Sequence, residues 1–368
     1  MPNDSTASAE SHLAPLSKGG AFVRLAGIGI VVLAVAGAFL YLGGWFSPNA
    51  LTPKRFADGF ERVGGIYSGF RRNHAKGVGV SGIFESNGRG TRLSKAVVFK
   101  AGRFPVIGRF SLAGGNPYVT DEPDMVRGLG LLFKLPDGDE WRTAMINTPV
   151  FAVNTPQAFY DRLVAAQPDP KTGMPDPEKM GRFLASHPET VQATKIIQSH
   201  PVSSGFDNSA YYGLNAFWLV DASGISMPVR WSMVPAQPFV PTNTIGPANA
   251  DKNYLFNALI VSILQHPLQW HLIITIGQPN DPTNDATIPW PDGREQVDVG
   301  TLTLDHVESE ETSSARDINF DPLVLPAGIV PTDDPLLSAR SAVYSQSFTR
   351  RAGEKKEPSA ITPSEVGK

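Results

Sequence analysis

Hydrophobic and polar positions divide the chain into zones of different character. The first residues are small and polar and show no apolar periodicity, which is typical of disorder. An uncharged apolar run then occupies Leu25–Leu42, and beyond it short apolar and polar runs alternate until a polar C-terminal stretch. We therefore expect a disordered tail at 1–20, a transmembrane anchor at 21–46, a linker at 47–55, a folded domain at 56–351 and a polar tail at 352–368.

The apolar run Leu25–Leu42 is long enough for a retained anchor. With its aromatic flank it reaches the roughly 20 residues that cross a hydrocarbon core. A cleaved signal peptide is the alternative, but its apolar region is about 7–15 residues long, and no clear A-x-A cleavage site follows here. Lys18 and Arg24 lie closer to the run than Lys54 and Arg55 do on its other side, which favours a cytoplasmic N-terminus. We expect a single-pass inner-membrane protein whose folded body lies in the periplasm.

Inside the folded region, short alternating runs separated by Gly, Asn and Pro predict strands, and runs with helical spacing predict helices. The predicted strands are Gly77–Glu85, Lys95–Lys100, Val106–Leu112, Leu129–Leu135, Asn147–Phe151, the hairpin of Tyr211–Val220 with Ile225–Val234, Leu268–Ile276 and Val297–Leu304. The predicted helices are Pro156–Ala166, Pro177–Gln198, Asn253–Gln265 and one that starts at Pro335 with Asp334 as its N-cap. This order predicts an α+β fold, dominated by a mostly antiparallel sheet with helical insertions.

Composition narrows the range of functions. The 368 residues are 41% hydrophobic with a formal net charge of -3, so the chain has material for a large core and lacks the basic excess of a nucleic-acid binder. Cysteine is absent, which excludes disulfides, thiolate metal sites and cysteine nucleophiles. This absence fits an oxidising compartment or a protein that handles oxidants.

The segment Arg71–Glu85 contains the first candidate catalytic residue, His74. A single histidine is more often structural than catalytic, and imidazole is only a candidate acid or base until geometry supports it. Gly77, Gly79 and Gly82 match the spacing of a dinucleotide-binding loop. That loop must follow a strand and open a helix, whereas these glycines lie within an alternating, strand-like run. We therefore expect strand glycines that allow close approach of a ligand or another backbone segment.

A second candidate pair lies near the C-terminus. Arg340 and Tyr344 are four residues apart on the helix predicted after Asp334, so they share one face. A guanidinium beside a phenol favours the phenolate, which is a hard anionic ligand for ferric iron. The alternative is an ordinary pair of surface neighbours.

Several separated segments, taken in order, resemble haem catalases, and specifically their shortened, membrane-anchored relatives, the catalase-related peroxidases. The resemblance covers most of residues 56–351. It implies a catalase-type antiparallel β-barrel with helical insertions, haem b as the cofactor, and no counterpart of the C-terminal domains of large catalases. Those domains help to build the tetramer of larger relatives, so the oligomeric state is open, a homodimer included. The matching segments are Arg71–Gly77, Arg109–Ser111, Arg127–Gly128, Asn147–Phe151, Asn215–Asp221, Asn319–Pro322, Pro326–Ile329 and Arg340–Tyr344.

The resemblance also implies a role for each matching site residue. Tyr344 would be the iron ligand, a use of tyrosine known for catalase, and Arg340 its hydrogen-bonded partner. His74 would be the distal histidine, supported by Ser111. The residues implied in holding or packing the haem are Arg71, Arg109 and Arg351 at its propionates, and Phe151 and Phe159 around the haem and its channel.

Three departures from the family pattern bear on activity. Counting back from Thr148 without a gap, the distal asparagine of catalases falls on Ile146, and Asn147 corresponds to the asparagine after it. Asn147 could supply the catalytic amide in place of Ile146 only through a local bulge. Asn73 stands where catalases have an apolar residue over the haem. Asn215 replaces a histidine that partners the arginine near the iron ligand.

The resemblance implies a haem peroxidase, active against oxidative stress, that reduces hydrogen peroxide or organic hydroperoxides with a small organic electron donor and has weak catalase activity at most. One alternative is a hydroperoxide isomerase or dehydratase, as in allene oxide synthases. Another is a haem carrier or sensor without enzymatic activity. The expected partners are peroxide, the donor and, through the N-terminal helix, the membrane, but no nucleic acid.

Overall fold

The computed structural model describes residues 18–42, 50–169, 171–242 and 251–365. The chain divides into two compact units, the first ending at Thr52 and the second beginning at Pro53. Residues 1–17, for which we expect disorder, lie outside the described residues. So do the end of the expected anchor at 43–46, the start of the expected linker at 47–49 and the last residues, 366–368.

The first unit contains one helix, α1 (Lys18–Leu42). Its stretch Gly19–Tyr41 has a mean hydropathy of 2.3, and by length and composition it could cross a membrane. The helix starts two residues before the expected end of the polar tail, while the expected anchor residues 43–46 are not described.

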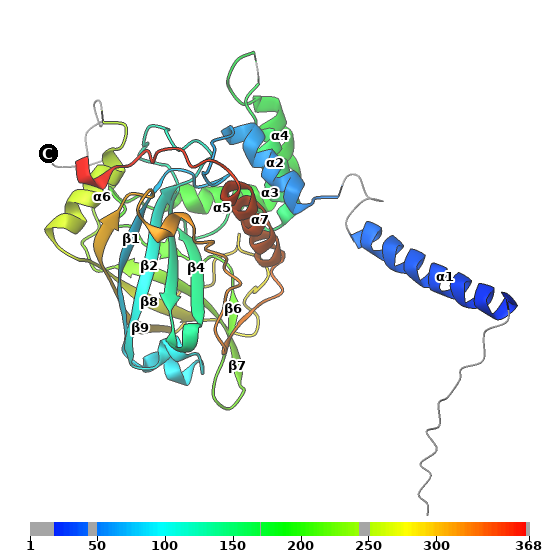
Figure 1. Ribbon diagram of the computed structural model, residues 1–368. Helices are drawn as coiled ribbons and strands as arrows, with labels where there is room; N and C mark the ends of the chain where they lie inside the picture. The colour runs from blue at the N-terminus through cyan, green and yellow to red at the C-terminus, as the bar shows by residue number, and fades with distance from the viewer. Residues whose placement is uncertain (1–17, 43–49, 170, 243–250, 366–368) are drawn as a thin grey trace, which may run out of the picture. The chain divides into compact units, whose positions relative to one another are not determined.

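The second unit is built around a closed antiparallel barrel (Figure 1). Its strands follow the order β7-β5-β4-β3-β2-β1-β9-β8, and the pairing of β8 with β7 closes the ring, while β6 and β10 extend the sheet beside β7. This architecture confirms the predicted α+β fold with a catalase-type barrel. The strands are β1 (Gly77–Ser86), β2 (Gly102–Leu112), β3 (Arg127–Lys134), β4 (Glu140–Ile146), β5 (Tyr211–Tyr212), β6 (Phe217–Val220), β7 (Ser226–Pro235), β8 (Leu268–Ile276), β9 (Gln296–Glu308) and β10 (Ile329–Pro331).

Aromatic side chains fill much of the barrel core. Phe133 stacks on Trp141 with ring centroids 4.7 Å apart, and Trp141 meets Trp231 edge-on at 5.3 Å. In β4, Trp141, Thr143 and Met145 are buried, while the alternate residues are half-buried on the outer face. One face of β4 therefore packs in the barrel core and the other lies on the outside of the barrel, because successive side chains of a strand point to opposite sides.

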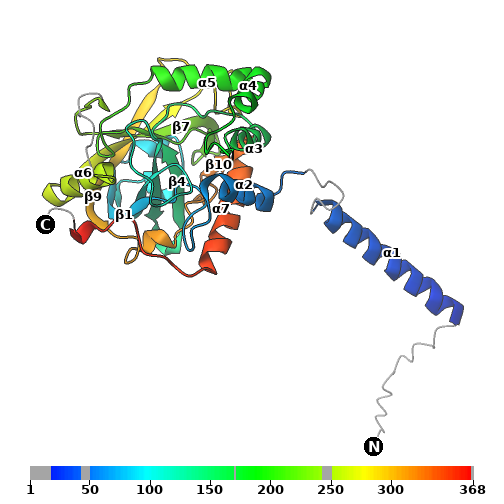
Figure 2. The ribbon, with the colours of Figure 1, turned by 90° about the horizontal axis from the view of Figure 1, so that it is seen from above.

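Helices lie on the outside of the barrel. Figure 2 shows α2, α3 and α7 side by side next to it, and α2 contacts both α3 and α7. The α-helices are α2 (Pro53–Gly64), α3 (Pro156–Ala165), α4 (Pro177–Ser186), α5 (Pro188–Ser199), α6 (Tyr254–Gln265) and α7 (Pro335–Ala352). Short 3-10 turns are η1 (Arg89–Arg92), η2 (Val97–Phe99), η3 (Pro136–Gly138), η5 (Ser314–Arg316) and η6 (Pro363–Glu365).

The segment after α7 stays against the body although its sequence is polar. The Ser68 hydroxyl donates to the carbonyl of Lys355 at 2.6 Å, and Tyr118 donates to that of Pro358 at 3.0 Å. Ile361 is fully buried. The packing of this segment therefore continues beyond the expected domain end at 351.

Some predicted elements were wrong. The expected strand Lys95–Lys100 is the 3-10 turn η2, because a short apolar run can be buried without joining a ladder. The expected strand at Asn147–Phe151 is a turn, in which Pro149 lacks an N–H and Thr148 donates to the carbonyl of Val150.

Two further elements break where one was expected. The helix predicted for Pro177–Gln198 is interrupted at His187, whose non-helical backbone, with φ -131° and ψ 73°, precedes Pro188. The strand predicted for Tyr211–Val220 is divided into β5 and β6, because Leu214 adopts a φ of 66°. The hairpin of β6 with β7 around Asp221 is as predicted.

Candidate functional site

Helix α7 begins as the sequence predicts. The Asp334 carboxylate accepts a hydrogen bond from the Leu336 N–H at 2.9 Å, and Pro335 occupies the first turn. Four residues apart on this helix, Arg340 Nη2 lies 3.4 Å from Tyr344 Oη. The helix start thus sets which face carries the arginine and the phenol.

A chain of side chains fixes Arg340. Asp334 Oδ2 accepts from Asn215 Nδ2 at 2.7 Å, and Asn215 Oδ1 accepts from Arg340 Nη1 at 2.5 Å. Arg340 Nη2 also donates to the carbonyl of Ala144 on β4 at 2.8 Å. Burial raises the pKa of Asp334, an effect that its hydrogen bond from Asn215 opposes. The guanidinium is therefore aimed at Tyr344 by a buried carboxylate, an amide and a barrel strand.

His74 sits immediately before β1 in an unusual backbone conformation. Its φ of 55° lies in the left-handed region, which L residues rarely adopt. Its Nδ1 is 3.1 Å from Ser111 Oγ on β2. A β-carbon on Gly128 of β3 would lie 2.8 Å from Ser111 Oγ and 3.0 Å from His74 Nδ1, so only glycine leaves room for this pair.

The surroundings of His74 keep its imidazole neutral. Burial lowers its pKa from 6.5 to about 3, with further contributions from the positive charges of Arg109, Arg71 and Arg340. Arg340 bonds to Ala144 of β4, and His74 lies against Gly128 of β3, whose ladder partner on β4 is Ile146, so the α7 pair and His74 adjoin neighbouring parts of the β3–β4 ladder. A neutral imidazole in this region is available as a proton acceptor at ordinary pH.

Ile146 and Asn147 point to different surroundings. Ile146 pairs with Gly128 in the β3–β4 ladder and packs in a cluster with Leu214 and Leu336. Asn147 Oδ1 accepts from the Arg127 N–H at 2.8 Å, and Asn147 also lines a surface cavity. Ile146, rather than Asn147, therefore lies across the ladder from the glycine that accommodates His74.

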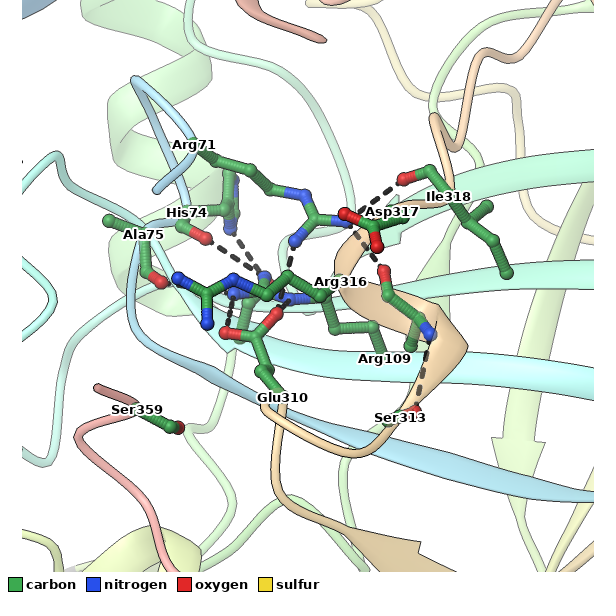
Figure 3. A network of polar contacts seen from close by, with 12 residues as sticks. Arg71, His74, Ala75, Arg109, Glu310, Ser313, Arg316, Asp317, Ile318 and Ser359 are labelled. Carbon is green, nitrogen blue, oxygen red and sulfur yellow. Dashed lines mark hydrogen bonds and ion pairs between the residues drawn. The ribbon is translucent and has the colours of Figure 1, made fainter. Parts of the chain in front are cut away.

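Arg71, Arg109 and Arg351 form a cluster with one buried carboxylate, Glu310, beside His74; Figure 3 shows Arg71, Arg109 and Glu310. Glu310 accepts from Arg109 Nε at 2.6 Å and Nη2 at 3.0 Å, and from Arg71 Nη1 at 3.1 Å. Arg351 donates to the carbonyl of Ile318 at 3.2 Å, and its buried Nε has no partner among the described residues. Sequence reasoning missed Glu310, because it lies in an acidic run that is typical of an exposed loop.

The two predicted aromatic residues occupy neighbouring positions. Phe151 and Phe159 stack with ring centroids 5.6 Å apart, and Phe159 also meets Phe56 of α2 at 5.4 Å. Phe151 belongs to the cluster that contains Ile146, whereas Phe159 extends into the helical layer. Asn73 Oδ1 accepts from the Gly114 N–H at 2.8 Å.

The arginine cluster provides a test of whether a haem fits these residues. Haem carries two carboxylates, and the cluster has two more guanidinium groups than carboxylates. Burial is the main reason that the pKa of Arg71 falls well below its ordinary value, and Arg109 and Arg351 lower it further. Anionic partners would relieve this repulsion, so the donor set suits the propionates.

Comparisons with known proteins agree with this geometry. The sequence model of the catalase family matches residues 69–361. The catalase-related peroxidase of Synechococcus elongatus is 39% identical over 306 residues, which cover 83% of this chain and 90% of that protein. The catalase-related peroxidase of Mycolicibacterium paratuberculosis is 30% identical over 306 residues, covering 83% and 96%.

Solved catalase structures share the fold. Catalase A from Saccharomyces cerevisiae superposes with a TM-score of 0.70 at 19% identity, covering 82% of this chain and 68% of that one. A bacterial catalase gives a TM-score of 0.68 at 21% identity, covering 78% and 58%.

The barrel, the site and these relatives define an oxidoreductase that acts on peroxide. The chain belongs to the catalase family, which depends on haem. The two catalase-related peroxidases support a peroxidase-type role within this family. The isomerase, carrier and sensor alternatives are not favoured.

Proposed function

We propose that this chain is a membrane-anchored peroxidase that uses haem b and a small organic electron donor to reduce hydrogen peroxide or organic hydroperoxides. Dismutation of peroxide is at most a weak side activity. The observation that carries the proposal is that His74, supported by Ser111, lies against Gly128 of β3, while Arg340, beside Tyr344, bonds to the adjacent strand β4.

Haem b, when bound, supplies a redox-active iron that activates the O–O bond of peroxide. Tyr344 would ligate that iron, and Arg71, Arg109 and Arg351 would hold the propionates by charge-assisted hydrogen bonds. Phe151 and Phe159 would pack around the haem and its channel, since flat aromatic surfaces suit one another. The surplus of positive charge beside Arg351 supports this assignment.

His74 is the residue that moves a proton. When Nδ1 carries hydrogen and donates it to Ser111 Oγ, Nε2 is an unprotonated base. It can take the proton from the O–H oxygen of peroxide and deliver it to the other oxygen as the O–O bond breaks. That second oxygen leaves as water or alcohol. The low pKa of His74 suits this role, because the imidazole is neutral at the start of each cycle.

Arg340 acts on Tyr344. Its Nη2 lies 3.4 Å from the Tyr344 Oη, so it would orient the phenolic oxygen that is proposed to ligate the iron. Asn215 and Asp334 hold the guanidinium in place, and an amide at position 215 does not titrate at ordinary pH. The contact of Arg340 with Tyr344 is therefore expected to vary little with pH.

Ile146 supports peroxidation over dismutation. An aliphatic side chain across from Gly128 cannot donate a hydrogen bond to a second peroxide molecule that must act as the reductant. An organic donor is less affected, because it can deliver electrons at the haem edge. The expected activity is therefore donor-dependent peroxide consumption with little oxygen release.

The proposal is tested by comparing two rates in the purified full-length protein. Oxidation of a dye donor by hydrogen peroxide should be far faster than oxygen evolution from peroxide alone. Oxygen evolution that exceeds donor oxidation would contradict the proposal. Turnover of a lipid hydroperoxide without any added reductant would instead indicate an isomerase.

We further propose that α1 anchors the enzyme in the inner membrane with its body in the periplasm, where it removes peroxide during oxidative stress. The apolar 23-residue stretch and the nearby basic residues before it support this topology. Protease added to intact spheroplasts should digest the body. Protection of the body until the membrane is breached would reverse the topology.

A further inference from the structure

Glu310 is a buried carboxylate without a part in the proposed chemistry. Its side chain is 3% exposed, as is that of Arg109. The carboxylate accepts hydrogen bonds from Arg109 Nε at 2.6 Å, from Arg109 Nη2 at 3.0 Å and from Arg71 Nη1 at 3.1 Å. A two-point contact of this kind fixes the plane of the guanidinium as well as its position.

The other hydrogen bonds of Arg109 lead to His74. Arg109 Nη1 donates to the carbonyl of His74 at 2.8 Å, and Nη2 donates to that of Ala75 at 3.0 Å (Figure 3). These carbonyls flank the left-handed backbone of His74, a conformation that costs free energy unless its surroundings hold it. Arg109 therefore uses four hydrogen bonds on Glu310 and the histidine backbone. Arg71 also donates through Nη2 to the carbonyls of Ala315 and Ile318, both at 2.9 Å, whereas the Nε of Arg351 has no partner among the described residues.

The charge of Glu310 matters as much as its contacts. Arg71, Arg109 and Arg351 carry three positive charges, and Glu310 supplies one negative charge. Arg316 lies at the edge of this cluster, and Asp317, its neighbour in the sequence, is paired with the Lys356 ammonium at 2.6 Å. Within the group formed by the three arginines and Glu310, two positive charges are left, which is the complement of a ligand with two carboxylates.

Electrostatics at Glu310 agree with this balance. Burial raises the pKa of the Glu310 carboxyl, but the positive charges of Arg109 and Arg71 outweigh it and hold the pKa below its ordinary value. The carboxylate is thus ionised at neutral pH. A buried ion pair that lost this charge would leave its partners uncompensated.

We propose that Glu310 is a positioning residue of the site. Through Arg109 it holds the backbone of His74, and as an internal counter-charge it limits the arginine cluster to the two charges that a dicarboxylate porphyrin neutralises. This inference rests on the proposed function, because it takes haem as the ligand. Arg109 is thereby shared between the His74 backbone and the propionates, which it would hold together with Arg71 and Arg351.

The test compares two ligands that differ only in charge. Full-length protein is prepared without haem in detergent and titrated with haem and with haem dimethyl ester, whose carboxyl groups are blocked. Wild-type protein should bind haem more tightly than the ester. Glu310→Gln keeps the size of the side chain but adds one net positive charge, so the preference for haem should grow by about tenfold. Loss of structure alone would lower the affinity for both ligands equally.

Controls separate charge from packing. Glu308→Gln removes an exposed carboxylate of β9 and should leave the ligand preference unchanged. Glu310→Asp keeps the charge but shortens the reach to Arg109, so it should retain the wild-type preference. In both Glu310 variants the amides of residues 74–76 should exchange hydrogen faster, because Arg109 holds their carbonyls less firmly.

An unchanged preference in Glu310→Gln, or an equal change in Glu308→Gln, would overturn the inference. If Glu310→Gln does not fold, an altered preference in Glu310→Asp would overturn it as well. Failure of wild-type protein to bind either ligand would refute the proposed function and this inference together. A wild-type preference for haem that Glu310→Gln leaves untouched would refute this inference alone.

Discussion

Ile146→Asn should raise oxygen evolution from hydrogen peroxide and leave donor oxidation nearly unchanged. Ile146 is directly opposite Gly128 in the antiparallel ladder, and such partners point to the same face with β-carbon positions about 4.5–5.5 Å apart. The β-carbon position of Gly128 is itself 3.0 Å from His74 Nδ1. An amide at position 146 would therefore lie next to the imidazole.

The expected size follows from the hydrogen bond that the amide adds. Removing one preorganised donor from an oxyanion hole costs about 10²–10³ in rate, which is a loose guide to what a donor restores here. The change also places a polar group in the apolar cluster with Leu214 and Leu336, at a cost of about 1–3 kcal/mol if the amide is left unpaired. We expect a gain in oxygen evolution of at least about tenfold, together with a lower melting temperature.

The assay uses an oxygen electrode for dismutation and a dye donor for peroxidation, with equal haem content in each sample. Asn147→Ala is the matched control, and it should change neither rate strongly, because the Asn147 amide bonds to the Arg127 backbone. Wild-type oxygen evolution at full catalase rates, abolished by Asn147→Ala, would refute the reasoning. A fall in both activities of Ile146→Asn without a change in folding would also count against it.

Three further predictions follow from the site. Tyr344→Phe should lose most bound haem or shift its charge-transfer band, and an unchanged spectrum at full occupancy would exclude Tyr344 as the ligand. Gly128→Ala should slow peroxide consumption by about tenfold or more, because the added methyl group falls within 3.0 Å of both Ser111 Oγ and His74 Nδ1; an unaltered rate would show that this pair is not needed. The pKa of His74 is 6.5 in the unfolded chain and about 3 in the folded chain. The stability that neutral His74 contributes is therefore complete above pH 6.5 and declines as the pH falls toward 3. His74→Gln should flatten that part of the melting-temperature profile, and an equally steep profile would show that other groups dominate.

Local signals in the sequence predicted those elements whose determinants are local. The N-cap of Asp334 with Pro335 correctly marked the start of α7, and alternation correctly marked β1 with its three glycines. The helix predicted across Pro188 was wrong, because apolar spacing outweighed the restriction that a proline places on the preceding residue. Strand β4 was missed, since its outward positions mix charged residues with Ala144 and Ile146.

The arrangement of the site depends on contacts that are distant in the sequence. His74, Ser111 and Gly128 come together through the register of three neighbouring strands, which no single segment encodes. The resemblance to catalases suggested the first two and matched the third without explaining it. Glu310 could not be recognised, because an acidic run is normally solvent-exposed and only the folded chain shows it buried between Arg109 and Arg71.

The most direct test of the central claim is the absorption spectrum of the purified full-length protein, before and after one equivalent of hydrogen peroxide. We expect the spectrum of a ferric haem with a tyrosinate ligand, a rapid change on adding peroxide, and return to the starting spectrum when an organic donor is supplied. A protein that binds no haem, or a haem spectrum that peroxide does not alter, would contradict the central claim.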